Sequence, residues 1–130
     1  MLRKVWLTAG WLWVAIVFYL SLMPHPPEPV SFEGVDKLEH LVAYAWLMLW
    51  FCQVYLDQKM RMRLFVALAA MGVGIEILQS MGGYRYFEYA DMLANTLGVA
   101  IGWGSAQAGL GNILRALEGM TGSREIRGEQ

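Results

Sequence analysis

The sequence predicts an all-α membrane protein with four transmembrane helices and both termini in the cytoplasm. The 130 residues are 57% hydrophobic and only 16% charged, whereas soluble domains usually carry about 25% charged residues. Several apolar runs also approach the roughly 20 residues that a helix needs to cross a hydrocarbon core of about 30 Å. A soluble helical domain with an unusually apolar core is the weaker alternative.

Composition argues against several other classes of protein. The net charge is −1, so no basic field favours a nucleic-acid partner. The single cysteine, Cys52, cannot form an internal disulfide and sits in an apolar run, which is typical of a small core residue. No cofactor is implied, and the oligomeric state stays open.

The first predicted span covers residues 5–23, after Arg3 and Lys4. A cleaved signal peptide would share the basic start but would need small residues before a cleavage site. Here Met23 and Pro24 end the run, so we expect an uncleaved span. All four prolines follow within residues 24–29, and they exclude a helix there. His25, among these prolines, is most simply a solvated loop residue.

Three further spans are expected at residues 38–56, 64–81 and 91–108. Asp36 is a candidate N-cap for the second span. A short basic loop, residues 57–63, precedes the third. Residues 1–110 would then form one four-helix transmembrane domain, and residues 111–130 a short interfacial helix followed by a flexible cytoplasmic tail from Thr121.

The basic residues predict the orientation in the cytoplasmic membrane. Arg3 and Lys4 precede the first span, and Lys59, Arg61 and Arg63 lie between the second and third. The two remaining loops hold one basic residue each, Lys37 and Arg85. Cytoplasmic loops are enriched in Lys and Arg, so the multi-pass chain would have its proline loop and residues 82–90 outside.

Three spans carry a polar side chain at the same expected depth. His40, Glu76 and Asn95 each lie one turn in from the outer end of their span, which is roughly 6 Å at about 1.5 Å per residue. Glu76 is the one charged residue inside a long apolar run, and an ionisable group there is a candidate functional residue.

The spacing around these residues predicts that they face one another. Asn95 shares a helix face with Gly98 and Gly102, small residues that let a neighbouring helix approach closely. Each polar residue also has an ordinary alternative role, since an Asn on such a face is often only a packing hydrogen bond. Convergence of the whole set favours a pocket.

The chemistry of this set permits several activities. His40 and Glu76 could act as an acid–base pair, while Arg85 and Lys37 could hold a phosphate or carboxylate. His40, Glu76 and Asp91 could bind a divalent metal, but no diagnostic spacing is present, so we expect no metal site. The sequence has no HExxH, GxSxG, CxxC or P-loop motif.

The same residues carry a resemblance to a known family. From about Leu12 to Gly104, the chain resembles the VanZ-like family of small bacterial membrane proteins. The resemblance rests on four motifs in this order: Asp36-Lys37-Leu38-Glu39-His40 with Ala43-Tyr44, then Glu76-Ile77-Leu78-Gln79, Arg85 with Asp91, and Asn95-Thr96-Leu97-Gly98 with Gly102. Glu88 departs from the family pattern, in which Ser or Asp is more usual at this position. The family's named member gives low-level teicoplanin resistance.

Two hypotheses about function follow. The first is an integral membrane protein whose outward-facing polar pocket binds an envelope component, such as a lipid head group or a cell-wall precursor, and so modulates teicoplanin susceptibility. The second is an enzyme that uses His40 and Glu76 on a lipid-linked or phosphate-bearing substrate. A proton-coupled carrier is a third, weaker idea. The predicted binding residues are Asp36, Lys37, His40, Tyr44, Glu76, Gln79, Arg85, Glu88, Asp91 and Asn95.

Overall fold

A computed structural model describes residues 1–24, 32–83 and 86–128, with side chains described as far as residue 120. The described chain is all-helical, as expected. Its elements, in order, are α1 (Leu2–Leu22), α2 (Val35–Val54), α3 (Gln58–Met81), α4 (Tyr89–Gln107), the 3-10 turn η1 (Leu110–Asn112) and α5 (Ile113–Gly128).

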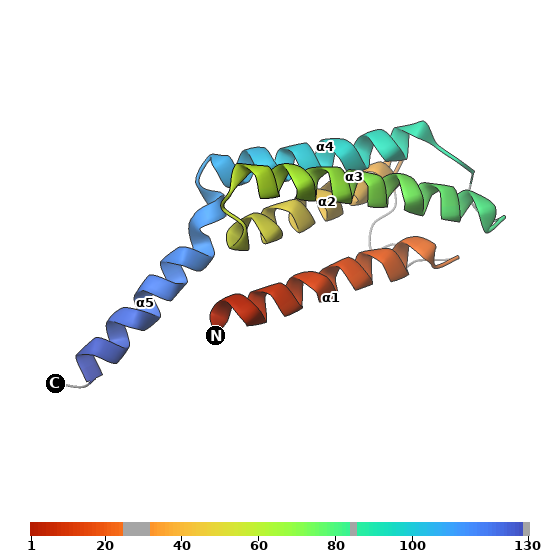
Figure 1. Cartoon of the computed structure of the whole chain (residues 1–130). Coiled ribbons are helices and arrows are strands. Elements are labelled where there is room, and N and C mark those ends of the chain that lie inside the picture. The colour runs from red at the N-terminus through yellow and green to blue at the C-terminus, as the bar shows by residue number, and fades with distance from the viewer. Residues whose placement is uncertain (25–31, 84–85, 129–130) are drawn as a thin grey trace.

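The first four helices run side by side with alternating direction, and α5 extends away from them (Figure 1). We call the end at which α2 and α4 begin the mouth end, and the opposite end the base end. The bundle core contains Tyr44, Leu47, Met48, Cys52, Leu68, Val99 and Ala106. Cys52 is therefore the buried core residue that the sequence predicted.

Three expectations about helix ends were wrong. The N-cap of α2 is Gly34, at φ 82°, and Asp36 lies in the first turn. The supposed loop 57–63 is mostly helical, because the Asp57 side chain caps α3 by accepting from the Met60 amide at 3.0 Å. Helix α5 continues to Gly128, past the residue where we expected an irregular tail to begin.

Helices α2 and α4 form the tightest pair. A Cβ atom built on Gly98 would overlap the carbonyl oxygen of Leu41, and one built on Gly102 would overlap that of Ala45. The absence of side chains at these two positions lets the two backbones touch, as the sequence predicted. This contact fixes the depth of every polar residue on α2 relative to those on α4.

Helix α1 is anchored to α2 at the base end. The rings of Trp6 and Trp50 stack with centroids 4.3 Å apart, and each indole N–H donates to the other residue's carbonyl oxygen, at 3.2 and 2.9 Å. The Arg3 guanidinium also donates to the Val54 carbonyl oxygen at 3.1 Å. The base half of α1 is therefore held by polar as well as apolar contacts.

Two buried polar side chains organise the base end. Gln53 donates to the Leu110 carbonyl oxygen at 2.6 Å and accepts from the amides of Ile113 and Leu114, at 3.0 and 3.3 Å. Arg61 donates to the carbonyl oxygens of Tyr55 and Cys52, at 2.8 and 3.0 Å. Such bonds satisfy carbonyl and amide groups that helix ends otherwise leave unpaired.

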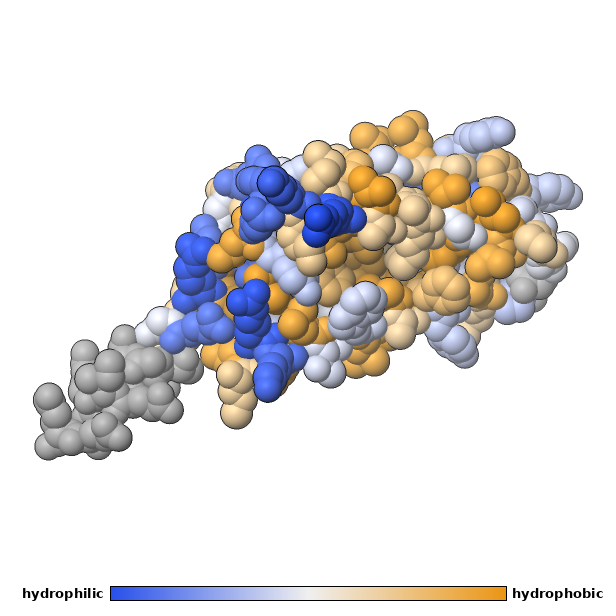
Figure 2. All heavy atoms as spheres, in the orientation of Figure 1, coloured by the Kyte–Doolittle hydropathy of each residue, from blue (hydrophilic) through white to orange (hydrophobic). Residues whose placement is uncertain are grey.

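The described part of the chain has two helices, α1 and α3, that are long and apolar enough to cross a membrane. Helices α2 and α4 are not apolar enough to be counted with them, because they carry most of the polar residues considered below. Hydrophilic residues gather at the base end, while the visible face of the bundle is mainly hydrophobic (Figure 2).

Candidate functional site

Lys37 lies at the centre of a carboxylate cluster at the mouth end. Its ammonium is 2.7 Å from Glu88 Oε2, 3.0 Å from Asp36 Oδ2 and 3.4 Å from Asp91 Oδ1. The first two contacts are hydrogen bonds, whereas Asp91 Oδ1 has no hydrogen-bond partner among the described residues. The three carboxylates thus come from the starts of α2 and α4 and meet around one cation.

The charges in this cluster stabilise one another. Hydrogen bonds from Lys37 to Glu88 and Asp36 raise the pKa of Lys37 well above its usual range. Desolvation alone would raise the pKa of Asp36, but the interactions with Lys37 outweigh it and lower that pKa. Lys37 therefore stays charged at neutral pH, with its charge directed to protein carboxylates.

His40 pairs with Asn95, one turn deeper than the carboxylate cluster. Nδ1 of His40 lies 2.9 Å from Oδ1 of Asn95. Since an amide oxygen only accepts, His40 donates through Nδ1 in this pair. No hydrogen bond joins His40 to Glu76 among the described residues.

Glu76 is buried between helices, at 2% exposure. Its Oε1 accepts from the backbone N–H of Glu88 at 2.7 Å, which ties the last turns of α3 to the start of α4. Its Oε2 has no hydrogen-bond partner among the described residues. A buried carboxylate with one oxygen unpaired is costly in free energy, which makes Glu76 the best single candidate for a functional residue.

Gln79 hydrogen-bonds to α1. Its amide donates to the Ser21 carbonyl oxygen at 2.7 Å. Gln79 lies one turn beyond Glu76, so this bond holds the end of α1 next to the site. Ser21 contributes through its backbone, and for that reason the sequence did not single it out as a contact.

Among the described residues, five side chains leave a buried polar atom without a hydrogen-bond partner. One is Trp103 Nε1, and the other four are Tyr44 Oη, Glu76 Oε2, Asp91 Oδ1 and Asn95 Nδ2. All four residues are at most 3% exposed, and they come from α2, α3 and α4. Most buried polar groups in proteins have partners. This concentration of unused hydrogen-bonding capacity marks the region as a candidate binding site.

Most of the predicted site residues therefore meet at the mouth end. Arg85 lies outside the described residues. Lys37, expected to hold an anion, instead contacts carboxylates of the chain itself. Gly72 is an addition, because a Cβ there would come within 3.0 Å of the Asn95 side chain, so this glycine makes room for Asn95 between α3 and α4.

The carboxylates also have the spacing of a cation site. Asp36, Glu88 and Asp91 each offer an oxygen, and these atoms lie within 4.8 Å of one another. The sequence had instead grouped His40, Glu76 and Asp91 as the possible ligands. Because Lys37 contacts all three of the clustered carboxylates, the ammonium already supplies the charge that a metal ion would bring.

A sequence model described as VanZ/LLP1 matches residues 3–110. The chain belongs to the VanZ/LLP1 family. The match covers all four bundle helices and every residue of the candidate site. The comparisons with curated proteins and with solved structures returned no match. Membership of VanZ/LLP1 thus supplies the family, while the role of each site residue depends on the geometry above.

Proposed function

We propose that this VanZ/LLP1 protein crosses the cytoplasmic membrane four times, with both termini inside and the mouth end outside. The spanning lengths of α1 and α3 support this. Helices α2 and α4 direct polar side chains at each other, which reduces the cost of placing them in a bilayer. Arg3 and Arg61 contact the C-terminal end of α2 at the base end, so the basic residues gather there as the positive-inside rule requires.

In this proposal, the buried polar side chains at the mouth end form a pocket, which we call the mouth pocket, that binds a polar group of a cell-envelope component. The observation that carries the proposal is the set of four buried side chains with unused hydrogen-bonding atoms, Tyr44, Glu76, Asp91 and Asn95. Their atoms include two carboxylate oxygens, one hydroxyl and one amide nitrogen. A ligand that supplies matching groups would satisfy these atoms at little further desolvation cost.

The charge of the described pocket indicates what kind of ligand fits. Lys37 is engaged by Asp36, Glu88 and Asp91, while Glu76 Oε2 and Asp91 Oδ1 have no hydrogen-bond partner among the described residues. The pocket therefore favours a ligand rich in hydrogen-bond donors, such as amines, hydroxyls and amides. Lipid head groups and cell-wall precursors at the outer face of the membrane both offer such donors.

The VanZ-like resemblance implies a role in teicoplanin resistance, and this supports glycopeptide susceptibility as the property that the site would influence. A protein that binds an envelope component at the outer face would change the access of a lipoglycopeptide to its target. We propose this as the physiological effect, and teicoplanin susceptibility as its readout.

The test is teicoplanin susceptibility of a Gram-positive host that expresses the wild-type chain, Asp91→Asn, Glu76→Gln or Glu33→Gln at matched membrane levels. Glu33 is an exposed carboxylate at the same end and serves as the matched control. We expect protection from the wild type and Glu33→Gln, and its loss in Asp91→Asn. Equal susceptibility of all four strains and the empty host would overturn the resistance role.

Glu76→Gln separates binding from acid–base chemistry. Glutamine keeps an oxygen that can accept from the Glu88 amide but cannot exchange a proton at neutral pH. Protection retained in Glu76→Gln and lost in Asp91→Asn supports binding. Protection lost in Glu76→Gln, with co-purified lipid unchanged, favours the enzyme alternative.

A further inference from the structure

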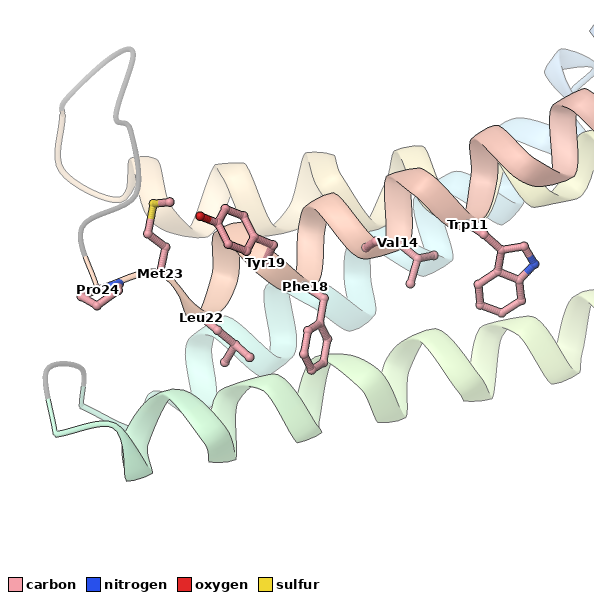
Figure 3. A pocket seen from close by; sticks show the side chains of 8 residues that line it. Trp11, Val14, Phe18, Tyr19, Leu22, Met23 and Pro24 are labelled. Carbon is pink, nitrogen blue, oxygen red and sulfur yellow. The ribbon is translucent and has the colours of Figure 1, made fainter.

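The mouth half of α1 carries an apolar groove of about 670 Å³. Trp11, Ala15, Phe18 and Leu22 lie along one face of the helix and line it, and Met23 and Pro24 line its mouth end. Figure 3 shows Phe18 and Leu22 projecting from α1 on the side of α3. Tyr19 is also part of the lining, so the groove surface is almost entirely hydrocarbon and aromatic.

The length of the groove matches one leaflet of a bilayer. Trp11 and Met23 are twelve residues apart, which corresponds to about 18 Å along a helix at about 1.5 Å per residue. One leaflet contributes about 15 Å of a hydrocarbon core of about 30 Å. An acyl chain that entered at the mouth end would therefore run along the groove to the middle of the membrane.

The groove ends beside the polar pocket. Ser21, on the last turn of α1, accepts a hydrogen bond from Gln79 at 2.7 Å, and Gln79 is one turn from Glu76 on α3. The α1 residues that line the groove, Leu22 and Met23, immediately follow Ser21. A molecule with an apolar tail in the groove would thus place its polar end next to Glu76.

A second apolar groove, of about 570 Å³, lies between α1 and α2 and serves as a comparison. Its α2 lining includes Leu38, Val42 and Trp46, which lie on a different face of α2 from His40, the partner of Asn95. A tail in this second groove could bring its head group to the pocket only by crossing α2. The first groove is therefore the one whose end is joined to the site, through the hydrogen bond from Gln79 to the Ser21 carbonyl oxygen.

We infer that the groove on α1 binds an acyl chain of a membrane lipid whose donor-bearing head group occupies the mouth pocket. This rests on the proposed function and specifies its ligand as an acyl lipid with an amine or hydroxyl head group. Trp11, Phe18 and Tyr19 are exposed along the groove half of α1, so in the proposed topology this face meets the bilayer, from which a lipid enters sideways.

The test uses the full chain in vesicles that contain a trace of phosphatidylethanolamine with a diazirine on one acyl chain, and in parallel the same probe as phosphatidylglycerol. After irradiation, mass spectrometry measures the label on Ala15, Phe18 and Leu22. The references are Leu97 and Ile101, exposed apolar residues of α4 that contact ordinary bilayer lipid. We expect the groove residues to be labelled several-fold more strongly.

Ala15→Phe fills the groove, and Ala100→Phe makes the same change at an exposed position of α4 outside it. Excluding two methylene groups from apolar contact lowers affinity about tenfold. We expect a groove-label loss of about this size in Ala15→Phe only. Ala15→Leu provides a smaller change if the phenylalanine variant does not fold.

The outcomes separate the groove from the pocket. Groove labelling no stronger than that of Leu97 and Ile101 overturns the groove, and leaves the proposed function to its own test. Strong groove labelling that falls in Asp91→Asn supports both. Strong labelling that is unchanged in Asp91→Asn for both probes supports the groove as a tail site and overturns head-group binding in the pocket.

Discussion

The carboxylate of Glu76 accepts a hydrogen bond from the backbone amide of Glu88, twelve residues later, at 2.7 Å. This bond closes the connection between α3 and α4 and fixes the first turn of α4, on which Asp91 lies. One oxygen of the buried carboxylate therefore has a structural role. The other has no hydrogen-bond partner among the described residues. This division allows stability and function to be separated by mutation.

The first prediction concerns the acceptor at position 76. Glu76→Gln keeps an acceptor for the Glu88 amide and should unfold at nearly the wild-type temperature. Glu76→Leu removes it and leaves a part-buried amide unpaired, which costs about 1–3 kcal/mol. Thermal unfolding in detergent, followed by circular dichroism, measures both. A leucine variant as stable as the wild type would contradict a structural role for this bond.

The second prediction concerns the contact between α2 and α4. Gly98→Ala forces a Cβ against the Leu41 carbonyl oxygen, and overpacking of this kind costs about 1–3 kcal/mol. Gly104→Ala is the control on the same helix, because no atom lies within 4 Å of its Cβ position. It should be neutral or stabilise the helix by roughly 0.5–1 kcal/mol. Equal unfolding temperatures for the two variants would argue against the close contact.

The third prediction concerns the pH dependence of the Lys37 cluster, which precedes the predicted span. The pKa of Asp36 is lowered, so its stabilising effect is present above its usual value of about 3.9 and is lost as the pH falls through the lowered value. The pKa of Lys37 is raised, so its effect is present below about 10.4 and is lost only at higher pH.

The unfolding-temperature difference between wild type and Lys37→Met should therefore be constant across neutral pH and shrink in acid. Unfolding scans at several pH values measure it, with Lys59→Met, at an exposed base-end lysine, as the control. A difference that changes steeply around neutral pH would mean that another titrating group controls the cluster.

The fourth prediction tests the orientation. Cys52 is the only cysteine in the sequence and is buried, so Cys52→Ala provides a background for single-cysteine labelling. Glu33→Cys places a thiol at the mouth end and Lys59→Cys one at the base end. An impermeant maleimide should label intact cells at position 33 and require lysis for position 59. The reverse pattern would invert the proposed topology.

Some of this arrangement could be predicted from the sequence because it follows from periodicity. A lone carboxyl in an apolar run has to be buried against the protein, and Glu76 is. Gly98 and Gly102, one turn apart, have to face a neighbouring helix closely, and they do. In both cases, the local pattern alone determines which side of a helix faces inward.

Other contacts depend on which helix is the neighbour, and a single sequence does not encode that locally. Lys37 looked free to bind an anion, yet it meets Glu88, fifty-one residues away. Arg61 was assigned to a basic loop and Gln53 was not singled out, because their partners are backbone carbonyl and amide groups, which carry no sequence signature. The start of α3 was missed because the charges of residues 57–63 resemble a loop.

The close pairing of α2 and α4 also has a consequence for how the protein is made. These two helices carry the paired side chains of His40 and Asn95, and among the described residues only α1 and α3 are apolar enough to enter a bilayer by hydropathy alone. His40 on α2 finds its partner only when Asn95 on α4 has been synthesised. In the proposed four-span topology, the insertion machinery would therefore have to hold α2 in a provisional position, and stable integration would be completed only after the fourth helix emerges.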